Sequence, residues 1–373
     1  MLRPHRLAVG FYDEDPATGK IVRTDRFELD VDGESTVVAA AAGKKRPAFI
    51  LVNDDDLTYT KLRFDADSLS FALANLQRFD DALARAVVWL SLWDMTRDGD
   101  LAAEKFIDTT LALLATETES TTFRYALSCM STTAWHYTAP DRRADVVKHV
   151  AKELWKLVIA APGGSDQQFQ LVTAYLGYGE EGDAEFAEHA QGLFDGSLIV
   201  AGLEIDNNFT WTIINALSSV KLIDQAGIDA QLAKRDTTEN REFALGAHAV
   251  RGDAAAKEWA WNEALNNADL TNMQLEAVAR GFGATPRPDL AEPYAAKYYD
   301  VVDWVWKNKS FHMAEALLEG LYPYYADPAT LVELGHRWLA DHEDADNALK
   351  RIVRGNVESS QRTLKVRDFN AAL

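Results

Sequence analysis

Cysteine is nearly absent: Cys129 is the only one in 373 residues, so no intramolecular disulfide can form. This composition is typical of a reducing compartment, and we expect a cytoplasmic protein. Because Leu127 and Met130 lie beside Cys129 in an apolar stretch, we predict that its thiol is a buried core group. Long apolar runs are also missing, since no stretch approaches the roughly 20 apolar residues that cross a bilayer. We therefore expect no membrane partner.

Basic residues are scarce as well. Lys and Arg number 38 against 58 Asp and Glu, which gives a formal net charge of −20. Such a surface repels phosphate backbones, so we exclude nucleic acid as a partner. The same charge favours solubility and attracts basic ligands. Hydrophobic residues make up 47% of the chain, which is enough for a sizeable core.

Motifs that carry hydrolytic or phosphate chemistry are missing too. The sequence has no His-Glu-x-x-His, no Gly-x-Met-Glu-Asn, no Gly-x-Ser-x-Gly and no phosphate-binding loop. Glu185 and His189 have the spacing of two zinc ligands, but their acidic helix favours a solvated ion pair. Asp54–Asp56 lacks the alternating ligands and the glycine of a calcium loop, which favours a turn. We predict no catalytic, cofactor-binding or metal-binding residue in this chain.

The N-terminal part has the period-2 pattern of β-strands. Apolar residues alternate with polar or small ones in Leu7–Phe11 and Phe27–Val31, on either side of the turn-forming segment Asp13–Gly19. Shorter candidate strands are Thr36–Val38, Ala48–Val52 and Leu57–Phe64. We predict a small antiparallel β-sandwich of about five or six strands as a domain over residues 1–65.

From Ser68 onward the apolar period becomes helical. Apolar residues three and four apart trace one face in each of the runs 83–93, 146–158, 186–194, 275–282 and 331–338. Helix stop and start signals punctuate the chain at Gly99-Asp100, Gly182-Asp183, Gly252-Asp253 and Asp327-Pro328. We predict a mainly α fold, in which antiparallel helix pairs build a HEAT-like α-α superhelix over residues 66–373.

The ten tryptophans all lie in helical runs, where we expect most of them to pack between helices. Trp259 and Trp261 are two residues apart, as are Trp304 and Trp306, so the members of each pair point in different directions. One member of each pair is a candidate for a groove or an interface.

Several segments together resemble one known family. The junction Phe49-Ile-Leu-Val-Asn-Asp-Asp-Asp-Leu-Thr-Tyr-Thr-Lys-Leu-Arg-Phe-Asp65, the opening Leu2–Asp13 and the segment Arg23–Asp30 resemble the small β-sandwich domain of the aminopeptidase N family of zinc metallopeptidases, actinobacterial type, and its exit. Further along, Arg85–Gly99, Ala264–Phe282 and Ala314–Pro323 are similar to the helical domain that follows in this family. The resemblance covers nearly the whole chain.

The resemblance implies the non-catalytic C-terminal region of an enzyme that removes N-terminal residues from peptides. Zinc, the general base and the anchor for the substrate amine then belong to a preceding catalytic domain of the same enzyme, which becomes the expected partner together with peptide substrates. This chain would cap the active site and shape peptide access, and alone it should be inactive. The alternative is a free-standing α-solenoid scaffold for protein interactions.

A wall that receives peptides must bind their C-terminal carboxylate, and the planar fork of arginine suits that group. Arg124, beside Phe123 and Tyr125, is our first candidate for such a contact, and Arg280 at the end of an apolar helix is the second. Arg85 and Arg241 are weaker candidates because acidic neighbours can pair with them. A structural ion pair or a solvated side chain is the alternative for each of the four.

Overall fold

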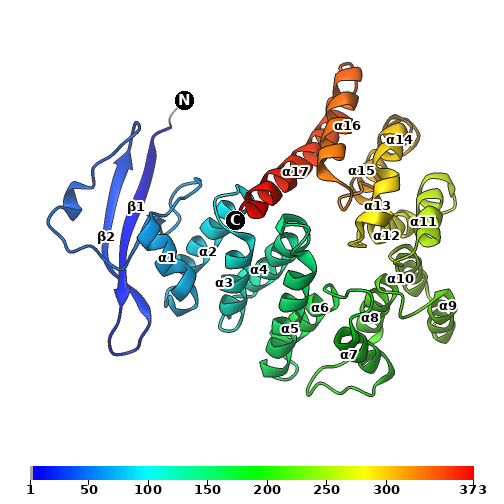
Figure 1. The fold of residues 1–373 in the computed structure, drawn as a ribbon, viewed down its shortest axis with the longest axis horizontal. Helices are drawn as coiled ribbons and strands as arrows, with labels where there is room; N and C mark the ends of the chain where they lie inside the picture. The colour runs from blue at the N-terminus through cyan, green and yellow to red at the C-terminus, as the bar shows by residue number, and fades with distance from the viewer. Residues whose placement is uncertain (1–2) are drawn as a thin grey trace. The chain divides into compact units, whose positions relative to one another are not determined.

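The computed structural model describes residues 3–373, and it confirms a mainly helical protein that begins with a small antiparallel sheet (Figure 1). Two compact units are distinguished, one formed by residues up to Glu153 with Lys365–Leu373 and the other by Leu154–Leu364. The first unit contains β1 (His5–Glu14), β2 (Ile21–Val31), η1 (Ala39–Ala41), β3 (Phe49–Asp54), α1 (Ala66–Asn75), η2 (Leu76–Arg78), α2 (Ala82–Arg97), α3 (Ala103–Leu114), α4 (Ser120–Thr132) and the π-helical turn η3 (Thr133–Tyr137).

The second unit contains α6 (Asp166–Leu176), α7 (Ala184–Asp195), α8 (Asn207–Ser219), α9 (Gln225–Lys234), α10 (Thr238–Ala249), α11 (Ala254–Asn266), α12 (Asn272–Gly283), α13 (Pro288–Ala291), η4 (Glu292–Tyr294), α14 (Ala295–Asn308), α15 (Phe311–Gly320) and α16 (Pro328–Asp341). Two helices, α5 (Arg143–Ala160) and α17 (Asn347–Ala371), contribute residues to both units.

The sheet has the order β2-β1-β3, with both pairs antiparallel. One face is apolar, since the buried residues Leu7, Val9 and Phe11 of β1 pack with residues of β2 and with Val38 and Ala41 of the loop that follows. On the other face Phe49 of β3 lies against the rings of Tyr12, Phe64, Phe71 and Phe79. The alternation along the sequence therefore predicted correctly on which face of the sheet these side chains lie.

Two of the expected strands do not form. Within residues 3–373 the sheet has only its three strands, and Thr36–Val38 and most of Leu57–Phe64 have no regular structure. The face that a second sheet would cover in a sandwich is instead covered by α1 and α2, which pack against β3. The short segments have the apolar alternation of strands, but a face of a sheet can be covered by the apolar side chains of helices as well as by a second sheet. The pattern alone therefore did not require these strands.

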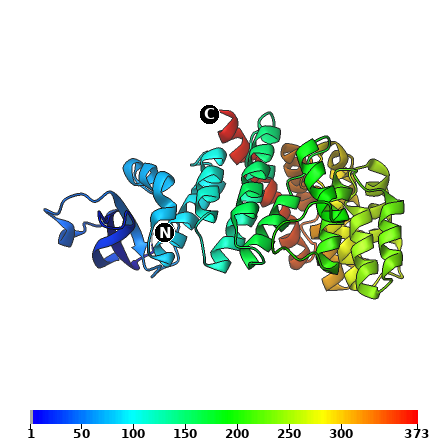
Figure 2. The same cartoon turned by 90° about the horizontal axis from the view of Figure 1, so that it is seen from below.

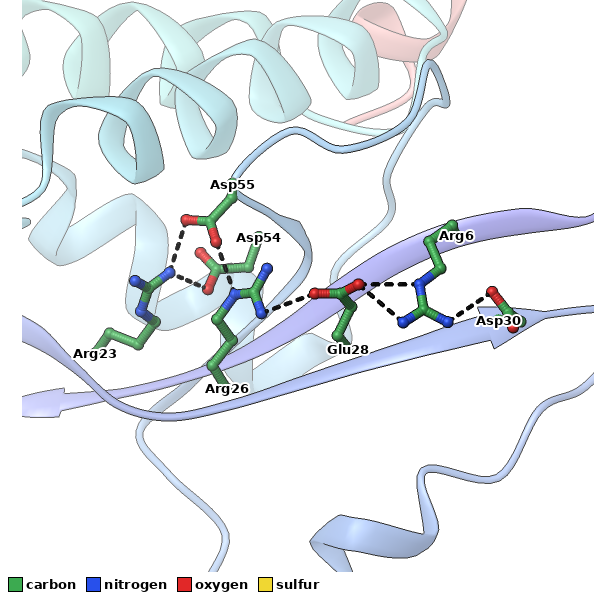
Figure 3. A network of polar contacts seen from close by, with 7 residues as sticks. All are labelled: Arg6, Arg23, Arg26, Glu28, Asp30, Asp54 and Asp55. Atoms are coloured by element: carbon green, nitrogen blue, oxygen red, sulfur yellow. Dashed lines mark hydrogen bonds and ion pairs between the residues drawn. The ribbon is translucent and has the colours of Figure 1, made fainter.

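A chain of ion pairs crosses the sheet on the face of Ala8, Gly10 and Tyr12 (Figure 3). It consists of Asp30–Arg6–Glu28–Arg26–Asp55–Arg23–Asp54, joined by contacts of 2.7 to 3.2 Å. Most of these groups are partly exposed, so each pair contributes little by itself. Asp54 differs because it is buried and also accepts a hydrogen bond of 2.6 Å from the Tyr12 hydroxyl.

The acidic run is a turn, as the sequence predicts. Asn53, Asp55 and Asp56 have φ angles of 59°, 66° and 52°, in the left-handed region that residues other than glycine enter only at a cost. The amide of Asn53 holds this turn by donating to the Thr58 carbonyl at 2.8 Å and to Asp56 at 3.1 Å. Asp54, at the end of β3, is thereby fixed beside Arg23 and Tyr12.

The helix signals in the sequence are mostly confirmed. Asp183, Asp253 and Asp327 cap α7, α11 and α16 with their carboxylates, and Pro328 begins α16. Asp100 was wrong as a helix start, because α3 begins after Ala102 and without a side-chain cap. The predicted face of α2 was also wrong in part. Leu83 and Leu90 are 47% and 41% exposed, because α2 is apolar on most sides and its packing selects another face.

In the second unit, helices α8, α10, α12 and α15 form one layer of neighbours that run parallel to one another. Asn207 at the start of α8 exchanges side-chain hydrogen bonds with Asn240 of α10. Farther along, Gly281 of α12 faces Gly246 of α10, and Gly283 faces Gly320 of α15. Contacts between every second helix are the pattern expected of stacked antiparallel helix pairs. Figure 1 shows α8, α10, α12 and α15 following one another, coloured from green to orange, and in Figure 2, seen from the perpendicular direction, helices of this unit overlap one another.

Small residues allow α10, α12 and α15 to approach closely. A methyl group added at Gly281 would lie 2.6 Å from the Gly246 carbonyl oxygen, and one added at Gly320 would lie 2.8 Å from the Ala279 side chain. Both distances are shorter than atoms tolerate, so the spacing of this layer depends on the absence of side chains at these positions.

We predict opposite effects of the same substitution at two helical glycines of this unit. Gly281→Ala should lower the free energy of unfolding by about 1–3 kcal/mol, because the new methyl group forces α10 and α12 apart. Gly355→Ala in α17 should raise it by about 0.5–1 kcal/mol, because nothing lies within 4 Å of the added group and alanine favours the helix.

Urea unfolding followed by circular dichroism measures both changes. Equal shifts of the two transitions in the same direction would contradict the close packing of α10 and α12.

Candidate functional site

Two of the four arginines selected from the sequence are held in ion pairs. Arg85 is nearly buried and donates to the Glu117 carboxylate at 2.8 and 3.1 Å and to the Phe79 carbonyl at 2.7 Å. Burial alone raises the pKa of Glu117, but Arg85 and the backbone amide of Glu119 bring that pKa below its usual value. Arg241 lies exposed on α10 and forms a two-pronged pair with Asp236 at 2.6 and 2.9 Å.

The other two arginines lie in different settings. Arg124 is exposed on α4 of the first unit, and Arg280 is exposed near the end of α12 in the second. Neither makes an ion pair or a side-chain hydrogen bond with any residue in the part of the chain that the structure describes. Both are therefore available to a ligand, and Arg280 also lines two cavities.

The larger cavity has a volume of about 540 Å³, within the range of pockets that enclose small ligands. Its walls are one face of α12 and one face of α15, followed by Tyr324. The lining residues are Glu276, Arg280, Gly283, Ala284, His312, Glu315, Ala316, Glu319, Gly320 and Tyr324. The second cavity, of about 280 Å³, lies between α8, α10 and α12 and shares Arg280 and Ala284 with the first. Arg280 thus stands where the two cavities meet.

The glycines that bring α12 and α15 together also leave space in the cavity. Gly283, Ala284, Ala316 and Gly320 line it with little more than backbone, so the long side chains around them stand above a hollow. Tyr324 closes one end, and its hydroxyl donates to the Asn356 side chain at 2.9 Å. Burial, followed by the charges of Tyr322 and Glu319, raises the pKa of Tyr324, so this residue stays neutral.

The buried lysine of α11 holds the end of α12 in place. Lys257 is 2% exposed, and its ammonium group donates to the carbonyl oxygens of Ala249 at 2.7 Å, Phe282 at 3.1 Å and Gly281 at 3.2 Å. It also donates to the hydroxyl of Thr285. These acceptors are the last carbonyls of α10 and α12, which carry the negative ends of the helix dipoles. Lys257 therefore fixes the backbone directly after Arg280.

Sequence reasoning missed Lys257, although a signal was present. Ala260, Trp261 and Ala264 follow it at the spacing of one helix face, and all three are buried, so a lysine on that stripe required a buried partner. His189 was also misjudged as part of a solvated pair. The His189 ring stacks on the Trp155 ring with 4.0 Å between the ring centroids, and its Nδ1 lies 2.9 Å from the Tyr175 hydroxyl oxygen, within hydrogen-bond distance.

The prediction that the Cys129 thiol is a core group is confirmed. Cys129 is buried, and burial raises the pKa of its thiol to about 12. Of the tryptophan pairs, Trp261 is buried and contacts Phe282, whereas Trp304 is 43% exposed. No three His, Cys, Asp or Glu side chains of residues 3–373 lie together as metal ligands would. None of the helices in the same range is long and apolar enough to cross a membrane.

We predict that Lys257→Met lowers the free energy of unfolding by about 1–3 kcal/mol, because it leaves buried helix-end carbonyls without a donor. The difference should depend on pH. Burial lowers the pKa of Lys257 from 10.5 to about 7, so between these values the unfolded chain binds more protons than the folded one. The stability of the wild type relative to the variant should therefore rise with pH across this window.

Denaturant unfolding at a series of pH values measures this difference. Lys234→Met on α9 is the matched control, since Lys234 is exposed and its ammonium group bonds, among residues 3–373, only to Gln231. A wild-type advantage that stays constant between pH 7 and pH 10.5 would show that the Lys257 pKa is not shifted.

The chain is similar to a known protein family and to a bacterial protein. Residues 49–362 match the family model described as the ERAP1-like C-terminal domain, a region that includes α12, α15 and Lys257. The chain is 34% identical over 371 residues to aminopeptidase N of Streptomyces lividans, a match that covers all of this chain and 43% of that relative. The resemblance to the C-terminal region of aminopeptidase N is thereby confirmed. This chain belongs to the family of ERAP1-like C-terminal domains.

Proposed function

We propose that this chain is the non-catalytic C-terminal region of a zinc aminopeptidase, and that it caps the active site and shapes the access of peptides. The family match supports this proposal, as does the relative named aminopeptidase N, of which the chain spans less than half. The zinc ion and the residues that hydrolyse the peptide bond would then lie in a catalytic domain of the same enzyme, which is the proposed partner. The cytoplasm is the proposed compartment, and the division at residues 65 and 66 stays a prediction.

The cavity around Arg280 is the observation that carries the role in peptide access. A peptide inside an enclosed chamber presents its C-terminal carboxylate away from the bond that is cut. Arg280 offers that carboxylate an exposed guanidinium group without a partner in the described residues, above a hollow of about 540 Å³. We therefore place the peptide contact at Arg280 in preference to Arg124, and Arg85 and Arg241 have acidic partners already.

We predict that Arg280→Gln weakens the binding of a peptide with a free C-terminal carboxylate by about ten-fold, the effect of a lost charged hydrogen bond. The same peptide with an amidated C-terminus should bind wild type and variant alike, because it brings no charge to the guanidinium. Fluorescence anisotropy of a labelled peptide with the 373-residue chain measures these affinities.

Arg337→Gln on α16 is the matched control, since Arg337 belongs to the same unit, is exposed and, within the described part of the chain, forms an ion pair only with Glu333 at 2.7 Å. An equal loss for the carboxylate and amide forms, or a loss in the Arg337 variant as well, would remove Arg280 from the proposed site.

We also predict that the purified chain, supplied with zinc, does not hydrolyse an aminoacyl anilide, because its residues do not form a metal site in the described range. Mixing it with the separately produced catalytic domain of its parent enzyme should give a complex, seen by analytical ultracentrifugation, and should change the hydrolysis of long peptides more than that of the anilide. Zinc-dependent turnover by the chain alone would overturn the proposal.

A further inference from the structure

The cavity around Arg280 holds more negative than positive charge. Three glutamates, Glu276, Glu315 and Glu319, line it against the single arginine, which leaves an excess of two negative charges if His312 is neutral. One of the three glutamates already has a partner, because the Glu276 carboxylate lies 3.0 Å from Nε2 of His312. A ligand that brings only a carboxylate would meet Arg280 and be repelled by the remaining two glutamates.

Basic side chains neutralise the two remaining carboxylates, those of Glu315 and Glu319, only weakly. Glu315 is 3.9 Å from Arg351, whose side chain is 72% exposed, and this geometry contributes little. The side chain of Glu319 has no ion pair or hydrogen bond with any residue from 3 to 373. Both lie on α15 one helical turn apart, an arrangement of like charges that costs the isolated helix a few tenths of a kcal/mol. A cation between them would relieve that repulsion.

Arg280 and the two remaining glutamates stand on different helices. Arg280 belongs to α12, and Glu315 and Glu319 belong to α15, which runs parallel to α12 and contacts it closely at Gly283 and Gly320. A ligand that spans the cavity therefore meets a positive group on one helix and negative groups on the other. A C-terminal lysine or arginine residue carries the complementary pair of charges, the terminal carboxylate and the side-chain cation, joined by a flexible apolar stem.

We propose that this cavity selects peptides whose C-terminal residue is basic, with Arg280 binding the terminal carboxylate and Glu315 and Glu319 binding the side-chain cation. The inference rests on the proposed function, since it names the class of peptide that the same site takes. Glu315 and Glu319 are specificity residues in this assignment, and neither takes part in peptide hydrolysis.

The test compares the affinities of related labelled peptides for the 373-residue chain by fluorescence anisotropy. One peptide ends in lysine and a second ends in norleucine, which has a similar stem without the charge. A third has the composition of the first but carries its lysine in the middle and norleucine at the end. The third is essential, because a chain of net charge −20 attracts any basic peptide.

Wild-type protein should bind the lysine-ended peptide about five-fold more tightly than either of the others, the upper range for an exposed ion pair. The double substitution Glu315→Gln and Glu319→Gln should abolish this preference and leave the affinity for the norleucine-ended peptide unchanged or higher. Glu333→Gln on α16 is the control, since this exposed glutamate lies outside the cavity lining. The preference should also shrink in about 1 M salt.

The outcomes separate the two proposals. If all three peptides bind equally and still lose affinity in the Arg280→Gln variant, the preference for a basic residue is wrong and the peptide site remains. If the peptide with the internal lysine binds as tightly as the lysine-ended one, the attraction is general and the inference fails. If no peptide binds, the proposed function fails together with it. Unfolding curves of each variant verify that the helices are intact.

Discussion

The ammonium group of Lys257 satisfies the ends of two helices inside the protein. Helices α10 and α12 end side by side, and each leaves its last carbonyls without an intrahelical donor. In water these groups would be solvated, but here they are buried, and one lysine donates to carbonyls from both helices and to Thr285. The four acceptors offset part of the cost of burying this charge, and the lowered pKa of Lys257 reflects the part that remains. The position of Arg280 depends on this interaction, because its neighbour Gly281 supplies one of the acceptors.

The second constraint is the lack of side chains between neighbouring helices. Gly246, Gly281, Gly283 and Gly320 allow backbone to approach backbone, so α10, α12 and α15 lie closer than larger residues would permit. Two of them, Gly283 and Gly320, also line the cavity, where the absence of side chains leaves space for a ligand. A site of this kind needs few side chains that bind the ligand directly. The packing provides the hollow, and the exposed charges at its walls provide the selectivity.

Much of the fold could be predicted from the sequence because its signals are local. The alternation in Leu7–Phe11 and the caps at Asp183 and Asp253 depend on near neighbours in the chain, and they are confirmed. The strand expected at Leu57–Phe64 depended on a tertiary partner, and helices took that place. The face of α2 was ambiguous because the helix is apolar on most sides.

The candidate site was harder to predict from the sequence than the fold was. Arg124 and Arg280 look alike in sequence, since each is a lone arginine in an apolar helix. What separates them is the partner helix: α15 brings two small residues and three charged or titratable ones near Arg280, from a segment more than thirty residues away. Arg85 pairs with Glu117 over a separation of 32 residues, which local neighbours did not reveal.

The proposed site requires that a peptide places its C-terminal end in the cavity between α12 and α15. A crystal structure of the chain with a lysine-ended peptide tests this placement directly. We predict electron density for the last residue in that cavity, with the terminal carboxylate about 2.7–2.9 Å from the Arg280 guanidinium group. Ordered peptide whose C-terminus lies elsewhere, for example against Arg124 in the first unit, would contradict it.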